Sequence, residues 1–331
     1  MVRSFLNQFV MNKYSEIYGV DISKDVFDVV DTTGGHVLYY NDLKGFKMFS
    51  KTLVKRSLVV MEATGNYHYR LAQYLYQQGH LVSVVNPLSV KRFIQMKLSK
   101  VKTDKSEARA ILEYGCVNEV PLYTAKNKDQ AECLQLLRLM DTYLKHGTAI
   151  KNKLHGERTL GIPSKTVYRS LERSLRSLKK EISVLEARLE ELVKEHQQGQ
   201  LTLLKSIPGM GNKTAMVLLV LTDGFAKFEN AAQLCCYAGI TPTIRESGSS
   251  VRRRSRISKV GNRKLRNLLF LCSFSACKHN RACREIYERI TSKGKSKKLA
   301  LIAVSNKLLK KSFAIATSGL SYDEKYVSRL T

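Results

Sequence analysis

The sequence predicts a mixed α/β domain, then a helical connector and a mainly helical C-terminal domain. Up to about residue 90, short Val- and Ile-rich runs alternate with helical patterns, which is typical of an α/β sheet. Residues 127–200 instead carry leucines at helical spacing. Residues 201–331 combine apolar helical segments with 25 basic and only 7 acidic residues, a composition that sets them apart from the rest.

In the N-terminal domain, three strands are expected between Tyr14 and Asp42, at about 15–21, 25–31 and 36–41. Gly34-Gly35 suits the second of the two turns, because glycine adopts turn conformations without steric cost. The next elements are expected to be a helix near 43–54, a strand at 58–62, a helix at 67–78, a strand at 81–85 and a helix that starts at Asn86-Pro87.

The connector carries a heptad seam, in which apolar residues recur at alternating spacings of three and four. The seam consists of Leu175, Leu178, Ile182, Leu185, Leu189 and Leu192. Because it is shorter than four heptads, packing against a second copy and packing against the chain's own helix at about 131–156 are equal alternatives. Residues 197–200 are expected to be a linker. The predicted boundaries are a leader at 1–13, the α/β domain at 14–122, the connector at 123–200, the C-terminal domain at 201–320 and a tail at 321–331.

Four carboxylates are candidate metal ligands. Asp21 and Glu62 each end a buried apolar run, where an unpaired charge costs several kcal/mol. Asp104 and Glu107 are three residues apart, so they share one face of the next helix. RNase H-like nucleases use such a set to hold two metal ions about 4 Å apart, and oxygen ligands favour Mg²⁺, with Mn²⁺ as a substitute, over zinc. The alternatives are a turn aspartate at Asp21 and a helix cap at Thr103 or Asp104.

Residues 206–215 suit contact with a nucleic-acid backbone. They predict a helix–hairpin–helix, in which Gly209 and Gly211 let backbone N–H groups approach a phosphate near Lys213. An ordinary interhelical turn that contains glycine is the alternative.

The polar loop Glu246–Ser250 is the second chemical stretch, with candidate nucleophiles Ser247, Ser249 and Ser250. Eight basic residues follow it: Arg252, Arg253, Arg254, Arg256, Lys259, Arg263, Lys264 and Arg266. A serine among guanidinium groups is suited to attack a phosphate whose developing charge the arginines stabilise, whereas the bland alternative is a flexible linker. The helix expected at 262–279 should direct its leucines inward: Leu265, Leu268, Leu269 and Leu271.

The charge of the chain indicates its partner. Its 56 basic and 28 acidic residues give +28, of which +18 lies in residues 201–331. A region this cationic repels itself unless a polyanion neutralises it, so nucleic acid is expected. A membrane surface is the weaker alternative, because the sequence lacks an apolar run of transmembrane length and a signal-peptide pattern.

The seven cysteines include no CxxC pair and are expected to be reduced cytosolic thiols.

Together these stretches resemble the insertion-sequence-110 family of transposases, whose members act as RNA-guided DNA recombinases. The resemblance covers about residues 14–320 and rests on Gly19–Lys24, Met61–Gly65, Lys102–Asp104, Ser206–Gly211, Ala238–Pro242 and Glu246–Ser250. It implies an N-terminal RNase H-like (RuvC-like) domain with an Asp-Glu-Asp-Asp set, a coiled-coil connector and a C-terminal transposase domain with a nucleophilic serine.

By motif position, the resemblance places Asp21, Glu62 and Asp104 on the first three acids and Ser247 on the nucleophile. The fourth acid, usually aspartate, is Glu107 here, and its side chain is one methylene longer. The resemblance further implies Mg²⁺, donor and target DNA, a structured guide RNA, and active sites shared between subunits of a homodimer or tetramer. It also implies a bacterial, cytoplasmic and nucleoid-associated protein that does not bind membranes.

Two other functions remain open on the residues alone. One is an RNase H-fold junction nuclease in which water is the nucleophile and Ser247 only contacts phosphate. The other is a non-catalytic DNA- or RNA-binding protein, which the departure at Glu107 allows.

Overall fold

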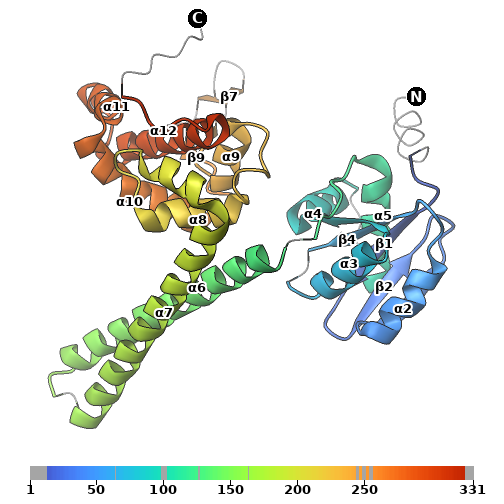
Figure 1. Ribbon diagram of the computed structural model, residues 1–331. Helices are drawn as coiled ribbons and strands as arrows, with labels where there is room; N and C mark the ends of the chain where they lie inside the picture. Colours follow the sequence, from blue (N-terminus) through green and yellow to red (C-terminus); the bar gives the residue numbers. More distant parts are fainter. Residues whose placement is uncertain are drawn as a thin grey trace, which may run out of the picture. The chain divides into compact units, whose positions relative to one another are not determined.

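The computed structural model folds into two compact units, residues 1–126 and residues 127–331 (Figure 1). The structure describes residues 13–63, 65–97, 103–125, 127–162, 164–243, 246–247, 251–252 and 256–324. At 246–247 and 251–252 it describes only the backbone. Apart from Lys13, the predicted leader therefore lies outside the described residues.

The N-terminal unit is built on a five-stranded mixed sheet. Its strands are β1 (Ile17–Ile22), β2 (Val26–Val30), β3 (His36–Tyr40), β4 (Leu58–Glu62) and β5 (Leu81–Val85). They are ordered β3-β2-β1-β4-β5, and the central strand β1 pairs antiparallel with β2 and parallel with β4. All five predicted strands are present. The apolar residues of β1, β2, β4 and β5 are largely buried, whereas in the edge strand β3 only Tyr39 is buried.

Helices cover both faces of this sheet: α2 (Leu43–Thr52), α3 (His68–Gln77), α4 (Pro87–Met96) and α5 (Asp104–Val117). One apolar core joins α2 and α3 to Val20 and Ile22 of β1. A second core joins α4 and α5 to Ile17, whose side chain lies on the opposite face. Helix α5 can lie close to β1 because residue 19 is glycine, where a Cβ would stand 2.3 Å from the carbonyl oxygen of Ala108.

The C-terminal unit begins with two long helices, α6 (Lys128–Thr159) and α7 (Lys165–Lys205), which pack against each other as a hairpin (Figure 1). In the predicted seam, Leu189 and Leu192 are buried in a core shared with α6, and the other four residues are half-buried. Packing within the chain is therefore present in the structure.

The linker predicted at residues 197–200 is wrong. Helix α7 continues through it, with a kink at Gln197, where φ is −138°. The helix resumes beyond the kink because Leu201 and Leu204 extend its apolar face into the core, and both are buried.

Among the described residues, the C-terminal unit has five further helices: α8 (Asn212–Thr222), α9 (Ala231–Ala238), α10 (Arg263–His279), α11 (Arg281–Ser292) and α12 (Lys297–Ser318). As the sequence predicts, α8 is buried along most of its length. Between α9 and α10, the part of the chain that the structure describes forms four two-residue strands: β6 (Pro242–Thr243), β7 (Glu246–Ser247), β8 (Val251–Arg252) and β9 (Arg256–Ile257). β6 pairs with β9, and β7 pairs with β8.

The inward orientation predicted for Leu271 is wrong. Its side chain is 64% exposed, whereas Leu265 and Leu269 are fully buried and Leu268 packs partly against the core. The buried face continues from Leu269 to Cys272, at helical spacing, and Leu271 projects from the other side.

Most of the cysteines are core residues, although Cys236 is exposed. All seven are unpaired thiols, and four of them are buried. Burial raises the pKa of the Cys133 and Cys283 thiols to about 11, which keeps both protonated at neutral pH. Among the described residues, no helix has the length and apolar character needed to cross a membrane.

Candidate metal centre and phosphate-binding loop

Two predicted carboxylates lie at one edge of the central sheet. Asp21 is near the end of β1, and Glu62 is the last residue of the parallel neighbour β4. Val20 is paired with Met61, so the two carboxylates follow neighbouring backbone positions. The carboxyl ends of adjacent parallel strands form the usual site of chemistry in open α/β sheets.

The other two carboxylates are presented by the first turn of α5. Thr103 is the N-cap, and a reciprocal pair of hydrogen bonds with Ser106 closes the capping box: each backbone N–H donates to the other residue's side-chain oxygen, at 2.8 and 3.1 Å. The cap therefore uses Ser106 rather than an acid, which corrects the capping role considered for Asp104. Asp104 and Glu107 both lie in this first turn, where the helix dipole stabilises negative charge.

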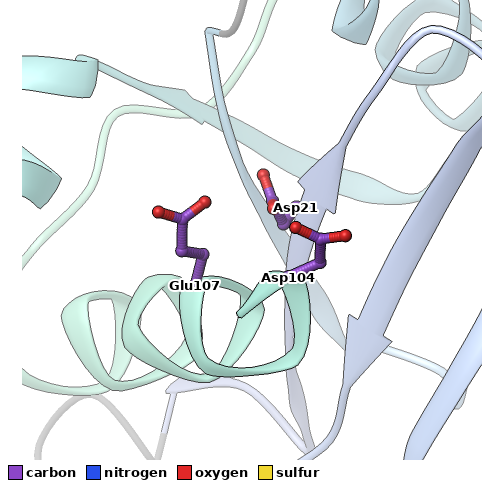
Figure 2. A group of neighbouring side chains, drawn as sticks. All are labelled: Asp21, Asp104 and Glu107. Atoms are coloured by element: carbon purple, nitrogen blue, oxygen red, sulfur yellow. The ribbon is translucent and has the colours of Figure 1, made fainter. Parts of the chain in front are cut away.

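The fold brings three of the four carboxylates together. Ligand oxygens of Asp21, Asp104 and Glu107 all lie within 4.8 Å of one another, as the fold of α5 over the end of β1 requires (Figure 2). Asp21 and Glu107 are half-buried, and Asp104 is exposed. Glu62 is not a member of this trio, although it lines the same cleft as Asp21 and Glu107.

The electrostatics of the trio fit a cation. Burial, followed by the charges of Glu107, Asp104, Glu62 and Asp28, raises the pKa of Asp21 to about 6. Crowded carboxylates repel one another unless a proton or a metal ion offsets their charge. Because the donors are all hard oxygens, the set suits Mg²⁺ or Mn²⁺ and has none of the sulfur or imidazole ligands that zinc prefers. Asp21, Asp104 and Glu107 would hold the ion, with Glu62 beside them.

A cleft of about 1210 Å³, lined by Asp21, Glu62 and Glu107, lies between the end of β1, α4 and the part of α5 from Ser106 to Glu113. Besides the acids, it is lined by four basic side chains: Lys24, Lys91, Lys97 and Arg109. A cleft that combines carboxylates with basic side chains suits an anionic substrate that is held through a metal ion, such as a DNA phosphate.

Asp28 and His36 also lie near these carboxylates, and neither was predicted from the sequence. Asp28 is 5% exposed, and its Oδ1 lies 2.6 Å from Nε2 of His36. Asp28 is the one charged residue in the otherwise apolar strand β2, and a charge inside such a run was the signal that pointed to it.

The proposed nucleophile lies in the C-terminal unit. Ser247 is in β7, with its backbone paired with Val251 of β8. The side chains of Ser247 and Arg252, and all of Gly248, Ser249, Ser250, Arg253 and Arg254, lie outside the described residues.

The base of this loop is firmly anchored. Arg266 Nη1 donates to the carbonyl oxygen of Ala238 at 2.9 Å, and Asn262 Nδ2 donates to the Tyr237 hydroxyl at 3.0 Å. Gly261 has φ +134°, and a Cβ there would lie 2.3 Å from the carbonyl oxygen of Tyr237. Helices α9 and α10 therefore hold the two ends of the loop together.

The remaining predicted phosphate contacts differ in their surroundings. Arg256, Lys259 and Arg263 are exposed. Lys264 instead donates from Nζ to the carbonyl oxygen of Leu137 at 3.0 Å, and burial lowers its pKa.

The two glycines of the predicted helix–hairpin–helix also differ. Gly209 has φ +97°, and a Cβ there would lie 2.6 Å from the backbone of Ala276, so close helix packing accounts for this glycine. Gly211 caps α8 with open space around it, and Lys213 contacts Glu186 of α7.

Two protein families match this chain, one over the carboxylates and the other over the serine loop. Residues 18–157, which contain the four carboxylates, match the DEDD transposase family of IS110 elements. Residues 201–288, which contain the serine loop, match the family described as "Transposase IS116/IS110/IS902 family". The chain belongs to the IS110/IS116/IS902 family of transposases.

This transposase is similar to several curated bacterial proteins. A pilin gene-inverting protein of Moraxella bovis is 28% identical over 323 residues, which cover 93% of this chain and 97% of that protein. A transposase for insertion sequence element IS1111A of Coxiella burnetii is 28% identical over 283 residues, or 77% and 76% of the two chains. An uncharacterized 43.6 kDa protein of insertion element IS110 from Streptomyces coelicolor is 33% identical over 159 residues, or 48% and 38%.

Proposed function

We propose that this transposase is a site-specific DNA recombinase that cleaves and exchanges strands at an Mg²⁺-binding carboxylate centre in an RNase H-like domain. The observation that carries the proposal is the approach of Asp21, Asp104 and Glu107 to within 4.8 Å of one another. Asp21, Asp104 and Glu107, with Glu62 beside them, would hold the metal, which would offset the charge that develops on a scissile phosphate.

Ser247 is the proposed nucleophile. Its hydroxyl oxygen bonds to phosphorus while the bond from phosphorus to a DNA oxygen breaks, and the serine proton balances the DNA hydroxyl that is released. The hydroxyl of a second DNA end then attacks the phosphoserine and frees the serine, so strands are exchanged without external energy. Arg252, Arg253, Arg254 and Arg256 are proposed to stabilise the charge on the phosphate.

The partners follow from charge and from the relatives. The +18 charge of residues 201–331 supports binding to donor and target DNA and to a structured guide RNA. The name of the Moraxella relative refers to gene inversion, a process that rejoins DNA as well as cutting it. We therefore favour recombination over simple cleavage, carried out by a dimer or tetramer of the chain.

A nuclease that uses water as nucleophile is the second candidate. It is favoured by one observation: the carboxylates and their cleft lie wholly within residues 1–126, whereas Ser247 lies within residues 127–331. Hydrolysis at that cleft would give free DNA ends and no protein–DNA bond.

Covalent trapping separates these functions. End-labelled DNA that carries the junctions between the insertion element and its flanking DNA is incubated with protein and Mg²⁺. The sample is then denatured and resolved by size. A labelled protein band that disappears in Ser247→Ala, but persists in Ser249→Ala and Ser250→Ala, supports the recombinase. Cleavage without a labelled protein band supports the nuclease. Binding without cleavage, in the parent and in Asp21→Asn alike, supports a non-catalytic protein and overturns the proposal.

A further inference from the structure

A second cleft, of about 910 Å³, adjoins the acidic cleft within the N-terminal unit. Its walls are residues 31–34 between β2 and β3, the end of α4, and α5. Three residues line both clefts: Lys97 after α4, and Arg109 and Glu113 on α5. The two clefts therefore meet at this group of charges.

Glu113 forms ion pairs with both cations at the point where the two clefts meet. The Lys97 ammonium contacts Oε2 of Glu113, and Arg109 Nε lies 3.5 Å from Oε1. The side chains of Lys97, Glu113 and Arg109 are 42%, 36% and 69% exposed. Ion pairs this exposed contribute little to stability, so a phosphate that competes for the two cations meets a small opposing free energy.

The second cleft offers apolar surface beside these cations. Phe93 and Met96 of α4 and Leu112 of α5 line it, and Met96 is 66% exposed. The Lys97 ammonium lies 4.9 Å from the centroid of the Phe93 ring. Cations next to aromatic and apolar side chains suit a single nucleic-acid strand, whose phosphates pair with the cations while its unstacked bases contact the apolar groups. A double helix would keep those base faces covered.

We propose that a single DNA strand runs from the carboxylate cluster across Lys97 and Arg109 into the second cleft, where its phosphate displaces Glu113. The inference rests on the proposed function, which places a DNA phosphate at the carboxylates. Glu113 then acts as an internal substitute for that phosphate, and it keeps the two cations in position when no DNA is bound.

The competing interpretation is structural: Glu113 fastens α4 to α5 and has no role in binding. The two interpretations predict opposite results for Glu113→Gln. If Glu113 competes with DNA, the variant should bind DNA with about two- to fivefold higher affinity. This range corresponds to the free energy expected for a surface ion pair. If Glu113 only joins helices, the variant should melt at a lower temperature without gaining DNA contact.

Photo-crosslinking locates the strand directly. The photoreactive residue p-benzoylphenylalanine replaces Met96 in the full chain, and in a matched control it replaces Met48, which is 53% exposed on α2. Met48 adjoins Lys44, Lys47 and Lys51, so its surroundings are also basic, but α2 packs on the opposite face of the sheet. The probe is a labelled single-stranded DNA oligonucleotide of mixed sequence. Crosslinking at least fivefold stronger from position 96 supports the path, and equal or weaker crosslinking from position 96 overturns it.

Charge variants of the protein that carries p-benzoylphenylalanine at position 96 test the role of the residues at which the two clefts meet. Crosslinking should fall severalfold in the double variant Lys97→Gln/Arg109→Gln, rise in Glu113→Gln, and stay unchanged in the control Lys47→Gln/Lys51→Gln. An unchanged yield in the first two would overturn the role given to these three residues. A same-length RNA probe that crosslinks far better than DNA would assign the cleft to RNA and also overturn the proposal.

The outcome is separable from that of the proposed function, because crosslinking requires no cleavage. A strong crosslink from position 96 in a protein that never cuts DNA retains the strand path and removes the recombinase. A protein that recombines DNA without such a crosslink retains the recombinase and removes the strand path.

Discussion

Asp21 of β1 and Asp28 of β2 stand directly opposite each other in the antiparallel pairing of the sheet. Like charges in this relationship repel, and Asp28 is one of the charges that raise the pKa of Asp21. His36 contacts the Asp28 carboxylate from β3, with Nε2 2.6 Å from Oδ1. The candidate metal centre therefore extends sideways across three strands, beyond the carboxylates that face the cleft.

The raised pKa of Asp21 predicts how stability depends on pH. A folded-state pKa of about 6, above the ordinary aspartate value of 3.8, means that the folded state binds this proton more tightly than the unfolded chain does. The resulting stabilisation is complete below about pH 4 and is lost as the pH rises through 6. Metal-free Asp21→Asn should therefore melt several degrees above the parent at pH 7 and close to it at pH 4.

Two controls accompany that melting experiment. Asp25→Asn removes an exposed carboxylate in the neighbouring turn and should melt like the parent at both pH values. Added Mg²⁺ should raise the melting temperature of the parent more than that of Asp21→Asn, because only the parent keeps the full ligand set. Equal responses to Mg²⁺ would remove Asp21 from the metal centre.

Ser247→Ala should abolish strand exchange and leave the affinity for DNA within a few fold of the parent. One hydroxyl contributes little to an interface dominated by phosphate contacts. Recombination assays and DNA-binding titrations at fixed salt measure the two properties. Full recombination by the variant would transfer the nucleophilic role to Ser249, to Ser250 or to water.

Glu107 offers a test of the departure from the family's fourth aspartate. Its place in the first turn of α5 with Asp104 lets its longer side chain reach the trio. Glu107→Asp should keep or raise the recombination rate in Mg²⁺, whereas Glu107→Ala should lower it by roughly tenfold or more, as loss of metal ligation does. The rates are compared in Mg²⁺ and Mn²⁺, since Mn²⁺ tolerates irregular geometry better. An alanine variant as active as the parent in both metals would leave three carboxylates at the centre.

We expect the half-buried residues of the α7 seam to contact a second copy of the chain. Replacing Leu178, Ile182 and Leu185 with glutamine should reduce the molecular mass in solution to that of a monomer and leave the chain folded. Leu189→Ala is the contrasting variant: this residue is 1% exposed, so the change should cost about 2–5 kcal/mol of stability. Light scattering and thermal melts measure the two effects. An unchanged mass with a lowered melting temperature would assign the whole seam to the internal hairpin.

Local patterns in the sequence determined much of this protein. Periodicity and capping signals within short windows predict the strands that present Asp21 and Glu62, the helix that carries Asp104 and Glu107 on one face, and the buried helix α8. Such signals fail where burial depends on distant neighbours. Leu271 has the hydrophobicity of a core residue but the angular position of a surface one, and residues 197–200 have the composition of a linker inside a helix.

Only the tertiary structure decided which of these groups meet. Asp21 reaches Asp104 and Glu107 because α5 packs tightly over β1 at Gly19, and no repeat or spacing in the sequence encodes that approach. The pairing of β1 with β2 puts Asp28 opposite Asp21, and the packing of α4 beside α5 brings the two clefts together at Glu113. The physical reason is that periodicity records which side of an element is buried, whereas contacts between remote residues depend on the shapes of the surfaces that pack together.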